Sequence, residues 1–324
     1  MREKEPRIRL DPWAAEYEGA IQIGDEGQEP ARVDIRVESS VWAAVHPTGV
    51  PSSRAIAFVD GVRRIEHRLL IEDGSRTVFG LLGSYGVGAT VIEETARVAH
   101  EAIGRVAVTG AGLRLAPFEA PIGDGEIGVV FDPVAEPENT PAAPIEGLQK
   151  AMRASEAGLA ERLAAEVTVV FLDGPLTYVT AAARGPVVGF VKRLLRTYLD
   201  PAASVLLPRL EVGERTPLFL VEAAREPRYS WYLRIGEGRP IDSALTGIVR
   251  LEAPSGPGLD AARDLADLSA RELPRFASDS ARDPRAPQNL VPIGALEARL
   301  KHLLGDHAVI RRAIETRLHE EAAA

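Results

Sequence analysis

The chain of 324 residues contains no cysteine and very little lysine. The absence of cysteine excludes disulfides, zinc sites built from thiolates and cysteine nucleophiles. Any metal ion must therefore be held by oxygen or imidazole ligands. Arginine, which binds phosphate well, supplies all but four of the 38 basic residues, although GC-rich coding produces the same bias.

Long apolar segments are also missing. No run approaches the roughly 18 apolar residues of a membrane-spanning helix, and the first residues, MREKEPRIRLDP, lack the apolar core of a signal peptide. We therefore expect a cytoplasmic protein with no membrane partner. The formal net charge of −9 repels nucleic acid overall, so DNA binding would need a local basic groove or a bridging metal.

Apolar and alternating runs predict a strand-rich first half, in which neighbouring strands are antiparallel. The expected strands cover residues 55–59, 63–71, 77–85, 86–92 and 105–109. The glycine-rich stretch 83–88 lacks the Gly-Lys-Ser/Thr ending of a phosphate-binding loop, so we interpret it as a hairpin turn. The stretch 131–144, FDPVAEPENTPAAP, is rich in proline and acid and predicts a loop.

The second half mixes helical and strand patterns. Helices are expected at residues 145–166, 186–198, 258–271, 292–304 and 307–320, and strands at 167–172, 216–222, 230–235 and 246–252. This order predicts one α/β domain with a mixed sheet flanked by helices over residues 51–324, preceded by an N-terminal elaboration over residues 1–50.

Two aspartates follow apolar runs in the same way. Asp60 comes after AIAFV and Asp173 after VTVVFL, and glycine follows each. If both strands end there side by side, the carboxylates are neighbours and need a cation or a shared proton between them. Oxygen ligands favour Mg²⁺ or Mn²⁺, the ions of phosphoryl chemistry. The alternative is that each Asp-Gly pair is a plain turn.

A third acid is expected from the helix at residues 145–166. Glu156 follows Met152 by four residues and precedes Leu159 and Leu163, which places it on or beside the apolar face. A carboxylate there should be paired or coordinated. We therefore group Asp60, Glu156 and Asp173 as candidate catalytic and metal-binding residues.

The order of these pieces resembles the NurA nuclease family. The resemblance rests on the strand ending in Asp60-Gly61, further strands, a helix with an inward glutamate, and VVFLDGPL at residues 169–176. The later segments that carry it are PVVGFVKR, YSWYLRI, IVRLEAP and DPRAPQNLVPIGALEARL. It covers residues 54–305 and implies a ribonuclease H-like fold.

The resemblance also implies an activity. It implies a DNA nuclease that uses Mn²⁺ or Mg²⁺, with 5′ to 3′ exonuclease and single-strand endonuclease activity. It further implies a homodimer that works with a HerA-type hexameric ATPase translocase in DNA-end resection and double-strand break repair. The family's metal-binding acids correspond to Asp60, Glu156 and Asp173.

The chain departs from the family pattern at three positions. Val62 stands where a serine usually follows Asp-Gly, and Val291 and Arg299 stand where archaeal members carry a tyrosine and a histidine. The last ligand is therefore open between Asp283, which we favour as a further catalytic residue, Glu297, and none. An ordinary residue before proline is the alternative for Asp283.

Basic residues on one face of the expected helix at residues 186–198 are candidates for DNA binding. Lys192, Arg193 and Arg196 would line a DNA channel or contact the scissile phosphate, and a lysine at position 192 fits the resemblance. A solvated basic helix face is the alternative. The aromatic residues 229, 231 and 232 could stack on bases, but we favour a strand with one face in the core.

Two other functions remain open. One is a non-catalytic subunit that docks on a hexameric translocase and has lost its metal site, as the departures at Val62, Val291 and Arg299 allow. The other is a phosphatase of the haloacid dehalogenase type, whose strand normally ends in Asp-x-Asp. FVDGV and FLDGP both lack the second aspartate.

Overall fold

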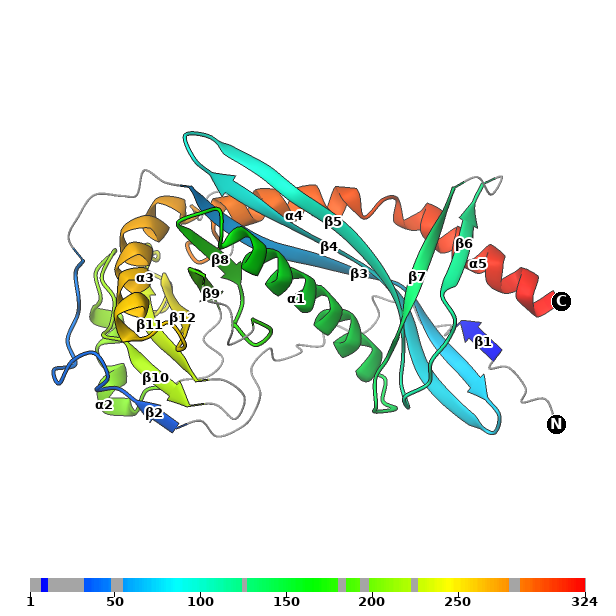
Figure 1. Ribbon diagram of the computed structural model, residues 1–324, viewed down its shortest axis with the longest axis horizontal. Coiled ribbons are helices and arrows are strands. Elements are labelled where there is room, and N and C mark those ends of the chain that lie inside the picture. The colour runs from blue at the N-terminus through cyan, green and yellow to red at the C-terminus, as the bar shows by residue number, and fades with distance from the viewer. Residues whose placement is uncertain are drawn as a thin grey trace.

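A large mixed β-sheet forms the centre of the fold (Figure 1). The computed structural model describes residues 7–10, 32–47, 55–123, 127–179, 185–192, 198–222, 227–279 and 286–323. Among the described elements the strand order is β2-β10-β11-β12-β9-β8-β3-β4-β5-β7-β6, and β1 pairs with β3 off this path. No helix in these described ranges is long and apolar enough to cross a membrane.

Three long strands form an antiparallel ribbon, as predicted for the first half. They are β3 (Ile56–Asp73), β4 (Arg76–Ile92) and β5 (Ala96–Thr109). Two expectations are wrong. Strand β3 does not end at Asp60, and the glycine-rich stretch 83–88 is no hairpin turn but the middle of β4.

The glycines inside β4 have a packing role. A Cβ at Gly83 would lie 2.6 Å from Leu148, whereas one at Gly88 would lie 3.2 Å from Leu296. These leucines belong to two helices on opposite faces of the sheet. The glycines are therefore there to let both helices approach the strand, which is one of the usual reasons for glycine inside a strand.

The edges of the sheet are completed by short strands. At one end β7 (Ile127–Ala135) runs parallel to β5 and pairs with β6 (Phe118–Ile122). The expected loop at residues 131–144 is therefore wrong in its first part, because β7 includes its first five residues. Strand β1 (Arg7–Leu10) pairs with the far half of β3, and β2 (Arg32–Asp34) pairs with β10 at the opposite end.

Helix α1 (Ala143–Leu163) connects the antiparallel ribbon to two parallel strands. These are β8 (Val169–Asp173), which runs beside β3, and β9 (Val187–Val191), which runs beside β8. The helix expected at residues 186–198 is wrong in its first half, because β9 occupies residues 187–191. All five residues of β9 are buried, so VVGFV has the continuous apolar run of a strand covered on both faces.

The remaining strands are antiparallel and lie beyond β9. They are β10 (Phe219–Glu222), β11 (Arg228–Arg234) and β12 (Ile248–Pro254). The short helix α2 (Pro201–Ser204) and the 3₁₀ turn η1 (Leu207–Arg209) precede β10 in the chain, and a second 3₁₀ turn, η2 (Leu273–Phe276), comes after β12. Trp231 and Tyr232 are almost completely buried. The aromatic strand is therefore part of the core, as favoured, but both of its faces are covered and not one, because neighbouring side chains point to opposite faces.

Helices cover both faces of the central strands. Helix α1 packs its Met152 and Leu159 against Val59 and Val170. On the opposite face, α3 (Leu259–Glu272) covers a cluster that includes Phe58 and Phe171, and α4 (Val291–Leu303) packs leucines on β3 and β4. Helix α5 (His307–Ala323) continues from α4 and packs against β6 (Figure 1).

Candidate metal centre

Asp60 and Asp173 lie at the same level of adjacent parallel strands. The last residue pair between the strands joins Val59 of β3 to Leu172 of β8, and the two aspartates follow directly. Two residues earlier the rings of Phe58 and Phe171 stack, with 5.4 Å between their centroids. Because alternate side chains share a face of a sheet, both aspartates lie on the face of these rings, toward α3 and α4.

The pKa of Asp60 is raised well above its ordinary value. Burial is the first cause, since the residue is 4% exposed. The negative charges of Asp173, Glu156 and Glu297 add to it, while Lys192 acts in the opposite direction. Glu297 comes from α4, so three separate elements bring negative charge to the carboxylate of Asp60.

Lys192 lies among these acids, directly after β9. Its ammonium group is 3.0 Å from both carboxylate oxygens of Asp173 and donates to the side-chain oxygen of the buried Asn289 at 3.1 Å. Burial lowers the pKa of Lys192, but the charges of Asp173 and Asp60 outweigh it, so the pKa is raised. Lys192 therefore stays charged. Its contact with Asn289 was not predicted from the sequence.

Glu156 approaches from the other face of β3. Its side chain is fully buried, and a Cβ at Gly61 would overlap with its Oε1 atom. Gly61 follows Asp60, so the two side-chain directions differ. The Oε2 atom of Glu156 accepts a hydrogen bond from Arg153 at 2.9 Å, and the same arginine nitrogen donates to the backbone oxygen of Asp173.

The donors have the right chemistry for a hard divalent cation, but they are not preassembled. Aspartate and glutamate oxygens are the ligands that Mg²⁺ and Mn²⁺ prefer, and a cation beside Asp60 would offset the repulsion between its neighbours. Within the described residues, no three His, Asp or Glu side chains already stand where they could hold a metal ion together. Asp173 and Glu156 instead contact Lys192 and Arg153.

The other positions that the sequence singled out either lie outside the described residues or have contacts elsewhere. Asp283, Arg193 and Arg196 lie outside the described residues. Val291 is 55% exposed, and the guanidinium of Arg299 pairs with Glu101 of β5 at 2.7 Å.

Val62 is buried against α4, in a cluster with Leu296 and Leu300. Its position gives a packing reason for an apolar residue where the family pattern has serine.

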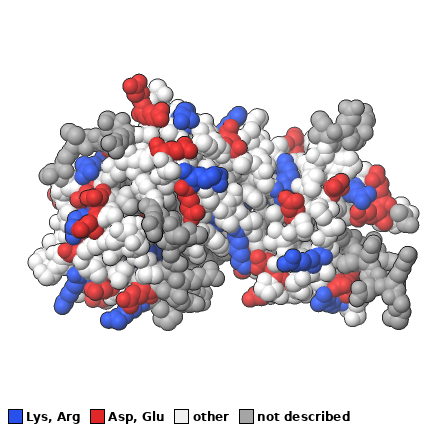
Figure 2. Space-filling view, in the orientation of Figure 1, with Lys and Arg blue, Asp and Glu red and all other residues white. Residues whose placement is uncertain are grey.

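Over the described residues visible in Figure 2, acidic and basic side chains are mixed. Lysine and arginine side chains are interspersed with aspartate and glutamate over the visible face. This agrees with the many exposed or partly exposed ion pairs, such as Arg76 with Asp73 and Arg239 with Asp242. Among the described residues, Lys192 and Arg153 bring positive charge to the candidate site.

The comparisons with known proteins find a likeness among solved structures but none among sequences. No family model and no curated protein sequence matches the chain. Among solved structures, the chain is similar to the NurA nuclease from Sulfolobus solfataricus, with 11% sequence identity and a TM-score of 0.48 over 86% of this chain and 88% of the other.

Proposed function

We propose that the chain is a metal-dependent DNA nuclease whose site is built on Asp60 and Asp173. The observation that carries the proposal is the placement of these two carboxylates at the same level of adjacent parallel strands, with Glu297 and Glu156 close enough to raise the pKa of Asp60. A buried group of acids is costly unless a cation compensates it.

The strand order supports a ribonuclease H-like core. Strands β5, β4 and β3 are antiparallel neighbours, helix α1 follows them in the chain, and β8 and β9 add in parallel beside β3. The candidate acids lie on β3 (Asp60), on the connecting helix α1 (Glu156) and on β8 (Asp173). That is the arrangement which the resemblance to NurA nucleases implies for Asp60, Glu156 and Asp173.

The residues have distinct tasks in the proposed reaction. Asp60 and Asp173 would hold the cation, and Glu156 or Glu297 would complete its ligands. A divalent cation bound there supplies activation of water and neutralises charge on the phosphate. Lys192, which is charged and next to Asp173, would bind a nonbridging phosphate oxygen and orient the scissile phosphodiester.

The finer assignments follow from the resemblance. They are Mn²⁺ as the working ion, 5′ to 3′ exonuclease and single-strand endonuclease activity, a homodimer, a HerA-type translocase as partner, and a role in DNA-end resection. A cytoplasmic location fits all of them.

A non-catalytic subunit is the second candidate. It is favoured by the contacts of Lys192 with Asp173 and of Arg153 with Glu156, because internal cations already compensate two of the acids. In that case the fold would serve a translocase complex without cleaving DNA. The two functions differ in whether the acids matter for cleavage.

A cleavage assay separates the two candidates. Purified protein is incubated with end-labelled single-stranded DNA in Mn²⁺ or EDTA. The nuclease proposal expects Mn²⁺-dependent cleavage that Asp173→Asn abolishes and that Asp264→Asn, the same change at an exposed position of α3, leaves intact. Full activity of Asp173→Asn would show that the site is wrong, and an inactive wild-type protein would favour the non-catalytic subunit.

A further inference from the structure

We propose that Arg153 is a positioning residue that holds Glu156 away from Asp60 and Asp173, so that a divalent cation must compete with its guanidinium group for the glutamate. The inference rests on the proposed function, because it concerns how the same acids would receive the cation. Arg153 was not among the residues that the sequence singled out.

The position of Arg153 is fixed by contacts with two elements. It lies on α1, three residues before Glu156, and its Nη1 atom donates to Glu156 Oε2 at 2.9 Å. The same nitrogen donates to the backbone oxygen of Asp173, the last residue of β8. Its side chain is 15% exposed and that of Glu156 is fully buried, so water screens the pair weakly.

The two Asp-Gly pairs make room for this ion pair. A Cβ at Gly61 would overlap with Glu156 Oε1, and a Cβ at Gly174 would lie 3.0 Å from both terminal nitrogens of Arg153. Gly174 also has a backbone φ of 102°, which residues that carry a side chain rarely adopt. The glycine after each candidate ligand therefore accommodates one member of the Arg153–Glu156 pair.

The pair keeps Glu156 on the α1 side of β3. Asp60 and Asp173 point toward α3 and α4, whereas the carboxylate of Glu156 lies over Gly61 on the opposite face. Within the described residues, no three acids stand ready for a metal ion. For Glu156 to join the two aspartates, its bond to Arg153 must be given up, and the cation has to offset that loss.

This competition predicts an unusual result for the removal of a charged residue. Arg153→Met, which keeps a long apolar side chain, should strengthen Mn²⁺ binding about tenfold, the lower end of the effect that an outer-shell partner has on metal affinity. Arg153→Met should have no effect on Mn²⁺ affinity when Glu156→Gln is also present, because that protein has no Glu156 carboxylate to release. Binding is measured by isothermal titration and by the loss of the free Mn²⁺ electron paramagnetic resonance signal.

Thermal unfolding gives a second readout and reports whether the variants fold. Without metal, Arg153→Met should lower the melting temperature, because it leaves Glu156 buried without its guanidinium partner. Added Mn²⁺ should raise the melting temperature of this variant more than that of the wild type, since at equal concentration a ligand that binds more tightly stabilises the folded protein more. Arg162→Met, an exposed arginine of the same helix, is the matched control and should behave as the wild type.

Distinct outcomes separate this inference from the proposed function. If Asp60→Asn weakens Mn²⁺ binding but Arg153→Met binds Mn²⁺ no more tightly than the wild type, the role of Arg153 is overturned and the proposed function stands. If the wild type binds Mn²⁺ and Asp60→Asn binds it equally well, the proposed site is wrong. Absence of Mn²⁺ binding by both the wild type and Arg153→Met would overturn both. If Arg153→Met fails to fold, Arg153→Lys replaces it, with an expected gain in affinity smaller than tenfold.

Discussion

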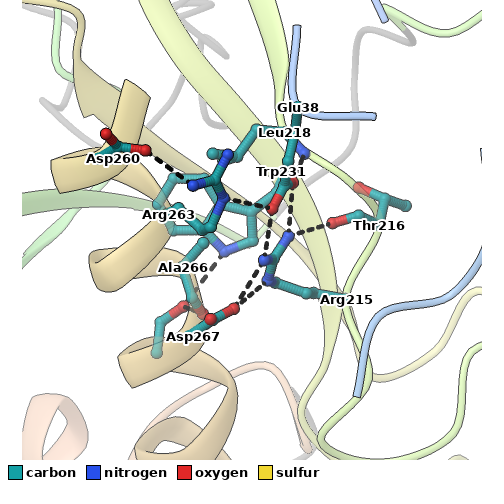
Figure 3. A network of polar contacts seen from close by, with 10 residues as sticks. Glu38, Arg215, Thr216, Leu218, Trp231, Asp260, Arg263, Ala266 and Asp267 are labelled. Carbon is teal, nitrogen blue, oxygen red and sulfur yellow. Dashed lines mark hydrogen bonds and ion pairs between the residues drawn. The ribbon is translucent and has the colours of Figure 1, made fainter. Parts of the chain in front are cut away.

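Two groups of charged residues in this chain differ in how their acids are compensated. In the first, which we call the Arg215 network, the guanidinium of Arg215 bonds both carboxylate oxygens of Glu38 and one of Asp267, and Arg263 joins Glu38 to Asp260 (Figure 3). Each acid there has at least one arginine partner. In the candidate metal centre, by contrast, Asp173 and Glu156 have cationic partners, but the buried Asp60 lies among acids.

The electrostatic consequences differ in sign. Burial raises the pKa of Glu38, but hydrogen bonds from Arg215 and from the backbone N–H of Leu218 outweigh it, so the pKa falls below 4.5. Burial also raises the pKa of Asp60, and its negative neighbours raise it further. The first group therefore stabilises the fold, whereas the second is tolerated at a cost. Arrangements of the second kind are characteristic of functional sites.

The Arg215 network has a clear structural task. Glu38 belongs to the segment that follows β2, and Asp267 and Arg263 belong to α3. The network therefore fastens the N-terminal segment to the helix that covers the core, and Trp42 adds a hydrogen bond from its indole to the backbone of Ala203.

The largest expected effect separates activity from stability. Asp60→Asn should reduce Mn²⁺-dependent DNA cleavage by about 10³-fold, as loss of a principal electrostatic group does. The same change should leave the free energy of unfolding unchanged or raise it, since it removes a buried charge that its neighbours repel. Rate measurements and urea unfolding of one protein sample test both parts. A large loss of stability would mean that Asp60 is a structural residue.

Breaking the Arg215 network should have the reverse profile. Arg215 is 1% exposed, so Arg215→Met leaves Glu38 and Asp267 without their main partner and should lower the free energy of unfolding by about 3 kcal/mol. Urea unfolding measures the change. Cleavage per folded molecule should stay near the wild-type rate, and a loss of cleavage in fully folded protein would contradict the separation of the two regions.

A smaller effect is expected at the glycine beside the site. Gly61→Ala places a methyl group against Glu156 and Met152 and should lower the free energy of unfolding by about 1–3 kcal/mol. The control is Gly158→Ala in α1, where the nearest atom is 3.6 Å away and the helix should gain about 0.5–1 kcal/mol. If both substitutions behave alike, Glu156 does not lie over Gly61.

The smallest effect is the pH dependence of the Arg215 network. Because the folded-state pKa of Glu38 is lowered, its contribution to stability is present above pH 4.5 and is lost as the pH falls through the folded-state value. The wild type should therefore lose more stability than Glu38→Gln below pH 4.5. Melting temperatures of both proteins at pH 3 to 6 measure the difference, and parallel curves would contradict the assignment.

Much of the central fold could be predicted from the sequence, because its strands and helices have clear periodicity. The antiparallel ribbon, α1, α3, α4 and α5 are near their expected positions. Strand ends were harder to predict. Gly61 and Gly83 indicate turns when only local sequence is considered, but both make room for side chains of α1. That requirement arises from tertiary packing and leaves no local signal.

The candidate site was predictable in part for the same reason. Asp60, Asp173 and Glu156 could be selected because each is an acid in an apolar context. Arg153 could not, because an arginine on a helix is ordinarily a solvated residue, and only the fold brings it to the end of β8. Asn289 likewise meets Lys192 through a contact between residues 97 positions apart.

If Asp60 and Asp173 form a cation site, a divalent cation bound to the protein should lie beside both carboxylates. Crystals of the protein grown or soaked in Mn²⁺ are measured at the manganese absorption edge. We expect an anomalous peak within coordination distance of both carboxylates, with the ammonium of Lys192 moved away from Asp173. Crystals with Mn²⁺ bound elsewhere and the Lys192–Asp173 contact intact would contradict it.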